Sequence, residues 1–168
     1  MKRSNFIKSA GMGTLLIPAT IFSSNKLRVQ DDPQLDKALV HKFVGASHSK
    51  MDVVKELLEE YPNLINAAHD WKLGDFETGL GAASHVGYKE LANYLLDYGA
   101  QVNIFTMALF GQLDILKPMI ENYPSTLNAR GPHGFTLLHH ANKGGDEALE
   151  VKDYLLSKGL KETKIALY

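Results

Sequence analysis

The sequence predicts an all-α repeat fold, because one helical apolar pattern recurs four times and two of the copies share a second motif. Each copy is a quartet of apolar residues at i, i+1, i+4 and i+5, which gives a helix one apolar side. The quartets begin at residues 53, 91, 115 and 151, a mean step of about 33 residues. A single helix hairpin cannot bury such a side, whereas a stack of hairpins can. The quartets are Val53, Val54, Leu57 and Leu58; Leu91, Ala92, Leu95 and Leu96; Ile115, Leu116, Met119 and Ile120; and Val151, Lys152, Leu155 and Leu156.

Residues 1–24 carry the pattern of an export signal. Three basic residues lie among the first eight, and residues 9–24 are uncharged and partly apolar. A run this short, interrupted by glycines, is typical of a signal peptide rather than a membrane-spanning helix. Residues 3–8 resemble a twin-arginine signal with Ser4 in place of the second arginine. Two routes therefore remain open: export of the folded chain by the twin-arginine route and export of the unfolded chain by the ordinary route. We expect a periplasmic or secreted protein without a membrane span; the alternative is an amphipathic N-terminal helix.

A linker over 25–32 is expected next, and a helix-start signal marks its end. Asp32 suits an N-cap and Pro33 suits the first helical position. The repeat domain is therefore predicted over 33–162, with a short tail over 163–168. Four repeats are near the smallest stack that is stable, and we expect a monomer.

The motifs around the quartets resemble the ankyrin-repeat family over about residues 34–160. The family repeat reads Thr-Pro-Leu-His-x-Ala-Ala-x-x-Gly, followed by an apolar second helix and Gly-Ala. The copy over 78–100 matches best, and the copy over 136–159 keeps the family histidine as His139. The resemblance implies an ankyrin-repeat solenoid of about four helix-turn-helix repeats with hairpin-like finger loops. It also implies protein binding through the fingers and the concave face, and a structural, hydrogen-bonding role for His139.

A second regularity pairs the first copy with the third. Residues 61–67 open with Tyr-Pro, and so do residues 123–129, at the offset of 62 that also separates the two quartets. The domain therefore reads as a doubled two-repeat unit. Within the third copy, Pro118 removes a helical hydrogen bond, which predicts a kink or a shortened second helix.

The doubling allows the loops to be compared, and the first finger is longer than its counterpart. Ala67 and Thr78 are 11 residues apart, whereas Ala129 and Thr136 are 7 apart. The longer finger holds Trp71, the only tryptophan of the chain, and exposed aromatic residues beside charges are typical of binding hot spots. The alternative is that Trp71 folds back over the inner helices. The predicted partner-binding residues are His69, Asp70, Trp71 and Phe76 on the first finger, Phe105 on the finger entering the third repeat, and Arg130 and His133 on the finger between the last two repeats.

A metal or acid–base site made of histidines and carboxylates is a sharper alternative. The candidates are His69, Asp70, Asp75, Glu77, His85 and His133. Such donors suit zinc or another divalent ion, but their spacing matches no established metal or nucleophile motif. His85 is expected to pack on a helix and hydrogen-bond locally. His41 and His48 match neither the repeat motif nor a metal motif. We therefore expect no catalytic residue, no metal and no cofactor.

Composition narrows the class of partner. The chain has 18 Lys+Arg and 19 Asp+Glu, and it lacks the concentrated basic run that nucleic-acid binding would need. The absence of cysteine excludes disulfides, thiolate metal sites and cysteine nucleophiles. The leading hypothesis is a non-catalytic, exported scaffold that binds a protein partner. The alternative is a small-molecule or divalent-metal-binding protein, with hydrolysis as one option, that uses the His/Asp cluster.

Overall fold

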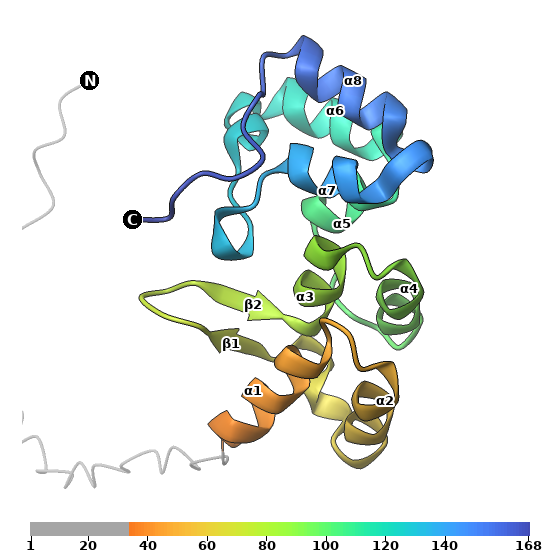
Figure 1. Cartoon of the computed structure of the whole chain (residues 1–168), viewed down its shortest axis with the longest axis vertical. Coiled ribbons are helices and arrows are strands. Elements are labelled where there is room, and N and C mark those ends of the chain that lie inside the picture. Colours follow the sequence, from red (N-terminus) through yellow and green to blue (C-terminus); the bar gives the residue numbers. More distant parts are fainter. Residues whose placement is uncertain (1–33) are drawn as a thin grey trace, which may run out of the picture. The chain divides into compact units, whose positions relative to one another are not determined.

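The computed structural model describes residues 34–168. The expected signal peptide over 1–24 and linker over 25–32 lie outside the described residues. The described part of the chain is mainly helical and carries one short two-stranded sheet, which confirms the predicted all-α class (Figure 1). Among these residues, no helix combines the length and the apolar character that crossing a membrane requires.

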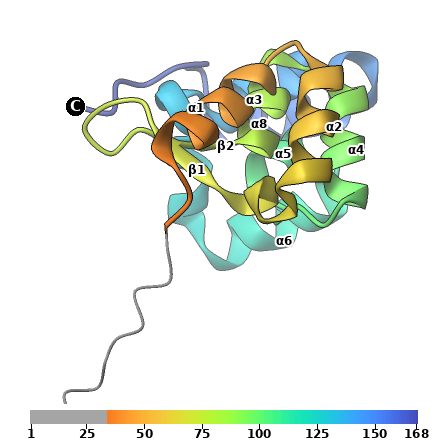
Figure 2. The same ribbon diagram turned by 90° about the horizontal axis from the view of Figure 1, so that it is seen from below.

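The helices of the described residues come in four consecutive pairs. Each predicted quartet lies on the second helix of its pair, where Leu58, Leu91 and Val151 are fully buried. The first helices of successive pairs contact one another and form an inner layer, beside which the second helices form an outer layer (Figure 2). The pairs are α1 (Lys37–Ala46) with α2 (Met51–Glu60), α3 (Gly79–Val86) with α4 (Lys89–Asp97), α5 (Ile104–Leu109) with α6 (Leu113–Asn122), and α7 (Leu137–Gly144) with α8 (Leu149–Ser157).

The core divides into two clusters, one mainly within the first two pairs and one within the last two. This division matches the doubled unit that the sequence predicts. Across the boundary, Ser84 on α3 and Thr106 on α5 share a buried hydrogen bond of 2.8 Å. The His139 ring on α7 hydrogen-bonds through Nε2 to the carbonyl oxygen of His85 at 2.8 Å. Polar contacts between inner helices therefore join the two halves.

The repeated Tyr-Pro motif forms the same local structure twice. Pro62–Asn66 and Pro124–Asn128 are both five-residue 3₁₀ helices. The tyrosines before them adopt nearly identical backbone angles, with φ and ψ of −131° and 75° at Tyr61 and −130° and 77° at Tyr123. The exits of the first and third pairs are thus equivalent, as the sequence predicts.

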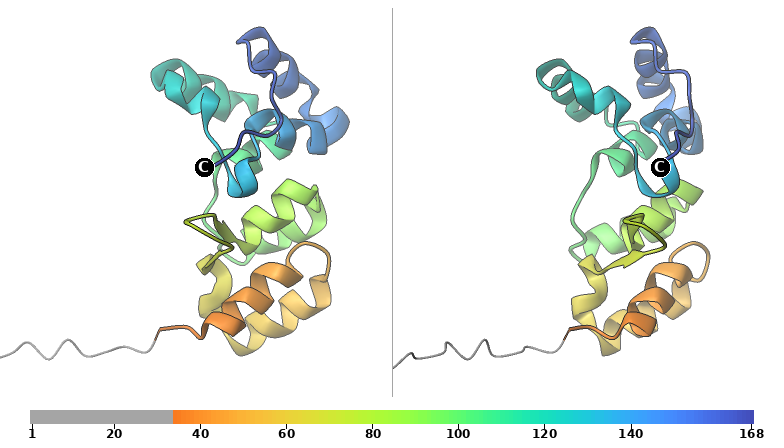
Figure 3. Two further views of the ribbon diagram at one scale, coloured as in Figure 1. Left: turned by 60° about the vertical axis from the view of Figure 1, so that its left-hand side comes forward. Right: turned by 90° about the vertical axis from the view of Figure 1, so that its left-hand side faces the viewer.

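The first finger is a β-hairpin that projects beside the inner helices (Figure 3). Its strands β1 (Ala68–Asp70) and β2 (Phe76–Thr78) pair antiparallel. Asp70 closes the turn, since its Oδ1 accepts a hydrogen bond from the Gly74 N–H at 3.0 Å, and Gly74 has the positive φ of 86° that such a turn requires. Two strands of three residues are marginal alone, so the hairpin depends on contacts at its base.

The second finger is a tight loop beside the C-terminal tail. Pro132–Gly134 forms a single turn of 3₁₀ helix, in which His133 adopts a left-handed φ of 58°. The Ile165 N–H donates a hydrogen bond of 2.8 Å to the Gly134 carbonyl oxygen. Residues 163–168 therefore pack against the finger as part of the fold.

Pro118 does not shorten its helix, so that part of the prediction is wrong. Helix α6 contains Pro118 and spans ten residues, as many as α2. The missing N–H would have paired with the carbonyl oxygen of Asp114, and both residues are exposed. Water can satisfy a carbonyl group there, so the lost hydrogen bond costs little.

Candidate functional site

Glu77 is the buried centre of the site, and strand alternation puts it there. On β2, Phe76 is 61% exposed whereas the next residue, Glu77, is 1% exposed, because successive side chains of a strand point to opposite faces. A buried carboxylate is costly unless it is paired and hydrogen-bonded. Its neighbours must therefore supply donors or positive charge.

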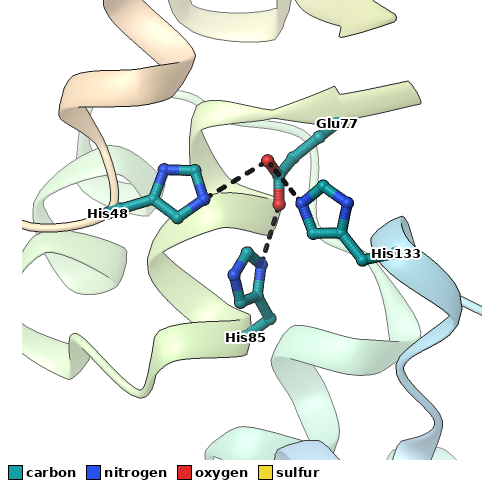
Figure 4. A group of neighbouring side chains, drawn as sticks. All are labelled: His48, Glu77, His85 and His133. Atoms are coloured by element: carbon teal, nitrogen blue, oxygen red, sulfur yellow. Dashed lines mark ion pairs between the residues drawn. The ribbon is translucent and has the colours of Figure 1, made fainter. Parts of the chain in front are cut away.

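Three imidazole rings surround the Glu77 carboxylate (Figure 4). His85 Nδ1 lies 2.8 Å from Oε1, while His48 Nε2 and His133 Nε2 each lie 3.5 Å from Oε2. The rings come from three separate segments: His48 follows α1, His85 lies on α3, and His133 belongs to the second finger. We call these four residues the His–Glu cluster.

Trp71 completes the surroundings of Glu77. Its indole Nε1 donates a hydrogen bond of 2.7 Å to Glu77 Oε2. The ring is half-buried and lies edge-on to His69, with 4.7 Å between the ring centroids, and to His41, with 5.4 Å between them. Trp71 therefore folds back and packs beside the inner helix α1, as the packing alternative describes.

Asp75 joins the hairpin to the second finger. Its carboxylate accepts two hydrogen bonds of 2.8 Å from His133, one from the backbone N–H and one from the ring Nδ1. Asp75 is only 4% exposed, and the two residues are 58 positions apart in the sequence. Two loops from opposite halves of the domain are thus joined at their bases.

Both buried carboxyl groups favour the ionised form. Burial raises the pKa of Asp75, but the hydrogen bonds and charge of His133 outweigh it and hold that pKa below its usual value. Burial likewise raises the pKa of Glu77, and the adjoining His85 ring and the Trp71 N–H together bring it below the usual value. Glu77 and the adjoining Asp75 therefore place two negative charges close to the three imidazoles of the His–Glu cluster.

Two polar atoms of the cluster lack hydrogen bonds. Glu77 Oε1 and His85 Nδ1 are both buried and, within residues 34–168, neither has a partner with hydrogen-bond geometry. Their 2.8 Å separation is therefore a close contact whose angle does not suit a hydrogen bond. Imidazole nitrogens and a carboxylate can hold a divalent cation or exchange protons.

The structure brings together some of the residues that the sequence singled out as a possible metal or acid–base site. Asp75, Glu77, His85 and His133 all meet, as that alternative required. His69 lies opposite Glu77 in the hairpin register and instead makes an edge-on contact with the Trp71 ring.

The remaining candidates divide between exposed and packed positions. Phe76 is exposed, Asp70 is exposed at the hairpin turn, and Arg130 is exposed beside the C-terminal tail. Phe105 is not on a finger, so its predicted placement is wrong: it lies in α5 and is half-buried against His140. The physical reason is that Asn103 caps the N-terminus of α5, so the helix begins at Ile104 and Phe105 lies in its first turn.

His48 is the cluster residue that sequence reasoning missed. It follows the first helix, where its Nδ1 bonds to the carbonyl oxygens of Val44 and Gly45 at 3.1 Å. A signal was present: with the quartets at 53 and 91 aligned, His48 falls beside the position equivalent to His85. A histidine therefore lies just after α1 and another near the end of α3, at nearly equivalent positions of two adjacent pairs.

Comparison with known proteins gives a partial likeness. No family model matches the chain. Over 118 residues it is 30% identical to alpha-latrocrustotoxin-Lt1a of Latrodectus tredecimguttatus. The match covers 66% of this chain but spans only 8% of the toxin. The described residues thus define a helical protein of successive pairs with a His–Glu cluster at the base of two fingers.

Proposed function

We propose that the chain is an ankyrin-repeat solenoid that binds a protein partner through its fingers and catalyses no reaction. The quartets recur at a mean step of about 33 residues, and the first helices of neighbouring pairs contact one another. Such units bury their apolar sides only against their neighbours, which is the physical basis of a solenoid. The export-signal pattern of residues 1–24 favours a partner in the periplasm or outside the cell.

The exposed apolar tip of the hairpin is the observation that carries this proposal. Leu73 is 81% exposed and Phe76 is 61% exposed. Asp75 lies between them in the sequence and is held by His133, so the tip is anchored from its base. A fixed apolar surface costs little ordering entropy on binding, and exposed apolar patches mark interaction sites.

A groove beside the tip extends the binding surface. It has a volume of about 330 Å³ and lies between the hairpin and the second finger, with Phe76, Phe105, Arg130 and Leu167 among its lining residues. The Arg130 guanidinium is exposed, and its Nη1 donates to the Ala166 carbonyl oxygen at 2.7 Å. Aromatic walls with one guanidinium suit a partner segment that presents an apolar side chain next to a carboxylate.

The test is capture of a partner from the exported fraction of the source cells. The wild-type chain is compared with Leu73→Ser/Phe76→Ser, which makes the tip polar, and with Ile115→Ser/Met119→Ser. The control pair is also exposed but lies on the second helix α6. We expect both variants to unfold at the wild-type urea midpoint, because surface substitutions change stability little.

The tip variant should lose the captured partner and the α6 variant should keep it. Retention of the same partner by the tip variant would place the interaction on another surface. Loss of the partner from the α6 variant alone would assign it to the outer helices and contradict the proposal.

A further inference from the structure

We propose that the His–Glu cluster is a binding site for a divalent transition-metal ion, which His48, His85, His133 and Glu77 coordinate. This site goes beyond partner binding, and it uses none of the exposed residues at the hairpin tip.

The donor atoms lie close to the separations that such an ion needs. Each of the four side chains offers one ligand atom, and all four atoms lie within 4.8 Å of one another. Zinc binds imidazole nitrogen and carboxylate oxygen at about 2.0–2.2 Å, so ligands of a tetrahedral site are roughly 3.3–3.6 Å apart. The contacts to Glu77 are 2.8 to 3.5 Å. Small side-chain adjustments therefore suffice for coordination.

The hydrogen bonds of two rings leave the correct nitrogen free. His48 Nδ1 faces the backbone carbonyl oxygens of Val44 and Gly45, which can only accept, so Nδ1 donates. His133 Nδ1 donates to the Asp75 carboxylate in the same way. In a neutral imidazole the other nitrogen, Nε2, then carries a lone pair. Both Nε2 atoms lie 3.5 Å from the same Glu77 oxygen.

When both rings are neutral, this arrangement is unfavourable unless a positive charge lies among the ligands. Two lone pairs directed at an anionic oxygen repel it, and a metal ion between them converts each repulsion into a coordinate bond. The fourth donor supports the same conclusion. Glu77 Oε1 and His85 Nδ1 are buried and lack hydrogen-bond partners in the described part of the chain. A buried polar atom without a partner costs free energy, and coordination would satisfy both atoms.

The surroundings have the features of an outer coordination shell. Histidine ligands of metals commonly donate their second N–H to a carboxylate or a backbone carbonyl. Asp75 has this role for His133, and the Val44 carbonyl has it for His48. The Trp71 indole donates to Glu77 Oε2 at 2.7 Å and orients the carboxylate. Each of these three ligands is therefore held in place by a group that does not itself bind the ion.

One side of the cluster is open to solvent. The side chains of His48 and His133 are each 26% exposed, whereas Glu77 is fully buried. An ion can therefore enter between the two outer rings. Three imidazoles and one carboxylate favour zinc and similar transition metals over magnesium and calcium, which prefer oxygen ligands.

Calorimetric titration of the full chain with zinc chloride tests the site. The protein is stripped with a chelator and freed of any histidine tag. His48→Asn is the first variant, because this ring is partly exposed and asparagine can still donate to the carbonyl oxygens that end α1. His41→Asn/His69→Asn is the matched control, since these two histidines lie on the same face with 4.7 Å between their ring centroids but outside the cluster. Circular dichroism verifies the fold of each variant.

We expect the wild type and the control to bind one zinc ion per chain, and His48→Asn to bind at least a hundredfold more weakly. Asp75→Asn removes an outer-shell charge and should weaken binding about tenfold to a hundredfold. Cobalt in place of zinc should give the intense visible bands of a four-coordinate site, and His48→Asn should lose them. The proposal is overturned if the wild type binds no zinc. It is also overturned if His48→Asn binds normally, or if binding disappears in the control and so belongs to surface histidines.

Discussion

Lowering the pH should destabilise the fold through His140, which is buried on α7. Its Nδ1 donates to the Thr136 carbonyl oxygen at 2.8 Å, and among the described residues its buried Nε2 has no partner. Burial is the main reason that the pKa of His140 falls from 6.5 to about 4. The folded state therefore holds this ring neutral at pH values where the unfolded chain takes up a proton.

The sign and size of the effect follow from that difference. Between about pH 6.5 and 4 the unfolded chain binds more protons at His140, so stability rises with pH and is lost as pH falls. A difference of about 2.5 pKa units at 1.36 kcal/mol each corresponds to a loss on the order of 3 kcal/mol over that window.

Urea unfolding, followed by circular dichroism in the presence of a chelator, measures this loss. The wild type and His140→Phe are compared at about pH 7 and about pH 4.5. Every other ionisable group is the same in both proteins, so the difference between the two pH dependences isolates His140. We expect the wild type to lose more stability than His140→Phe between these pH values. Equal losses would refute the assignment of a depressed pKa to His140.

Two further perturbations test the packing that supports the site. Trp71→Phe removes the N–H that donates to Glu77 Oε2 and should lower the free energy of unfolding by about 1–2 kcal/mol. An unchanged urea midpoint would show that this hydrogen bond contributes nothing to stability. Gly111→Ala should cost at least about 2 kcal/mol, because Gly111 has a φ of 67° and an added Cβ would clash with the carbonyl oxygen of Glu147. Gly45→Ala on α1 is the control for Gly111→Ala, since an added Cβ at Gly45 meets nothing within 4 Å. Gly45→Ala should stabilise the protein by about 0.5–1 kcal/mol. Equal effects from the two substitutions would contradict the structure.

The helix pairs were predictable because their signals are local. Residues a few positions apart define each quartet, and each quartet lies on the second helix of a pair. The Tyr-Pro motifs at Tyr61 and Tyr123 are equally local and give matching 3₁₀ helices. Phe105 shows the limit of this reasoning. The environment of Phe105 depends on Asn103, which caps α5, and the comparison of loop lengths did not consider Asn103.

The His–Glu cluster could be predicted only in part, since it depends on contacts between distant segments. Asp75 and His133 meet across 58 positions, and no periodicity in the sequence encodes that approach. His48 joins the site because the first helices of two neighbouring pairs end side by side at Glu77. That contact required the stacking geometry of the folded chain, which the quartet spacing alone does not specify.

The most direct test of the site at the base of the fingers is anomalous X-ray scattering from crystals grown with zinc. We expect one anomalous peak enclosed by His48 Nε2, His85 Nδ1, His133 Nε2 and a Glu77 oxygen, at about 2.0–2.2 Å from each. An empty cluster in zinc-loaded crystals, with any peak instead beside His41 and His69, would contradict the assignment.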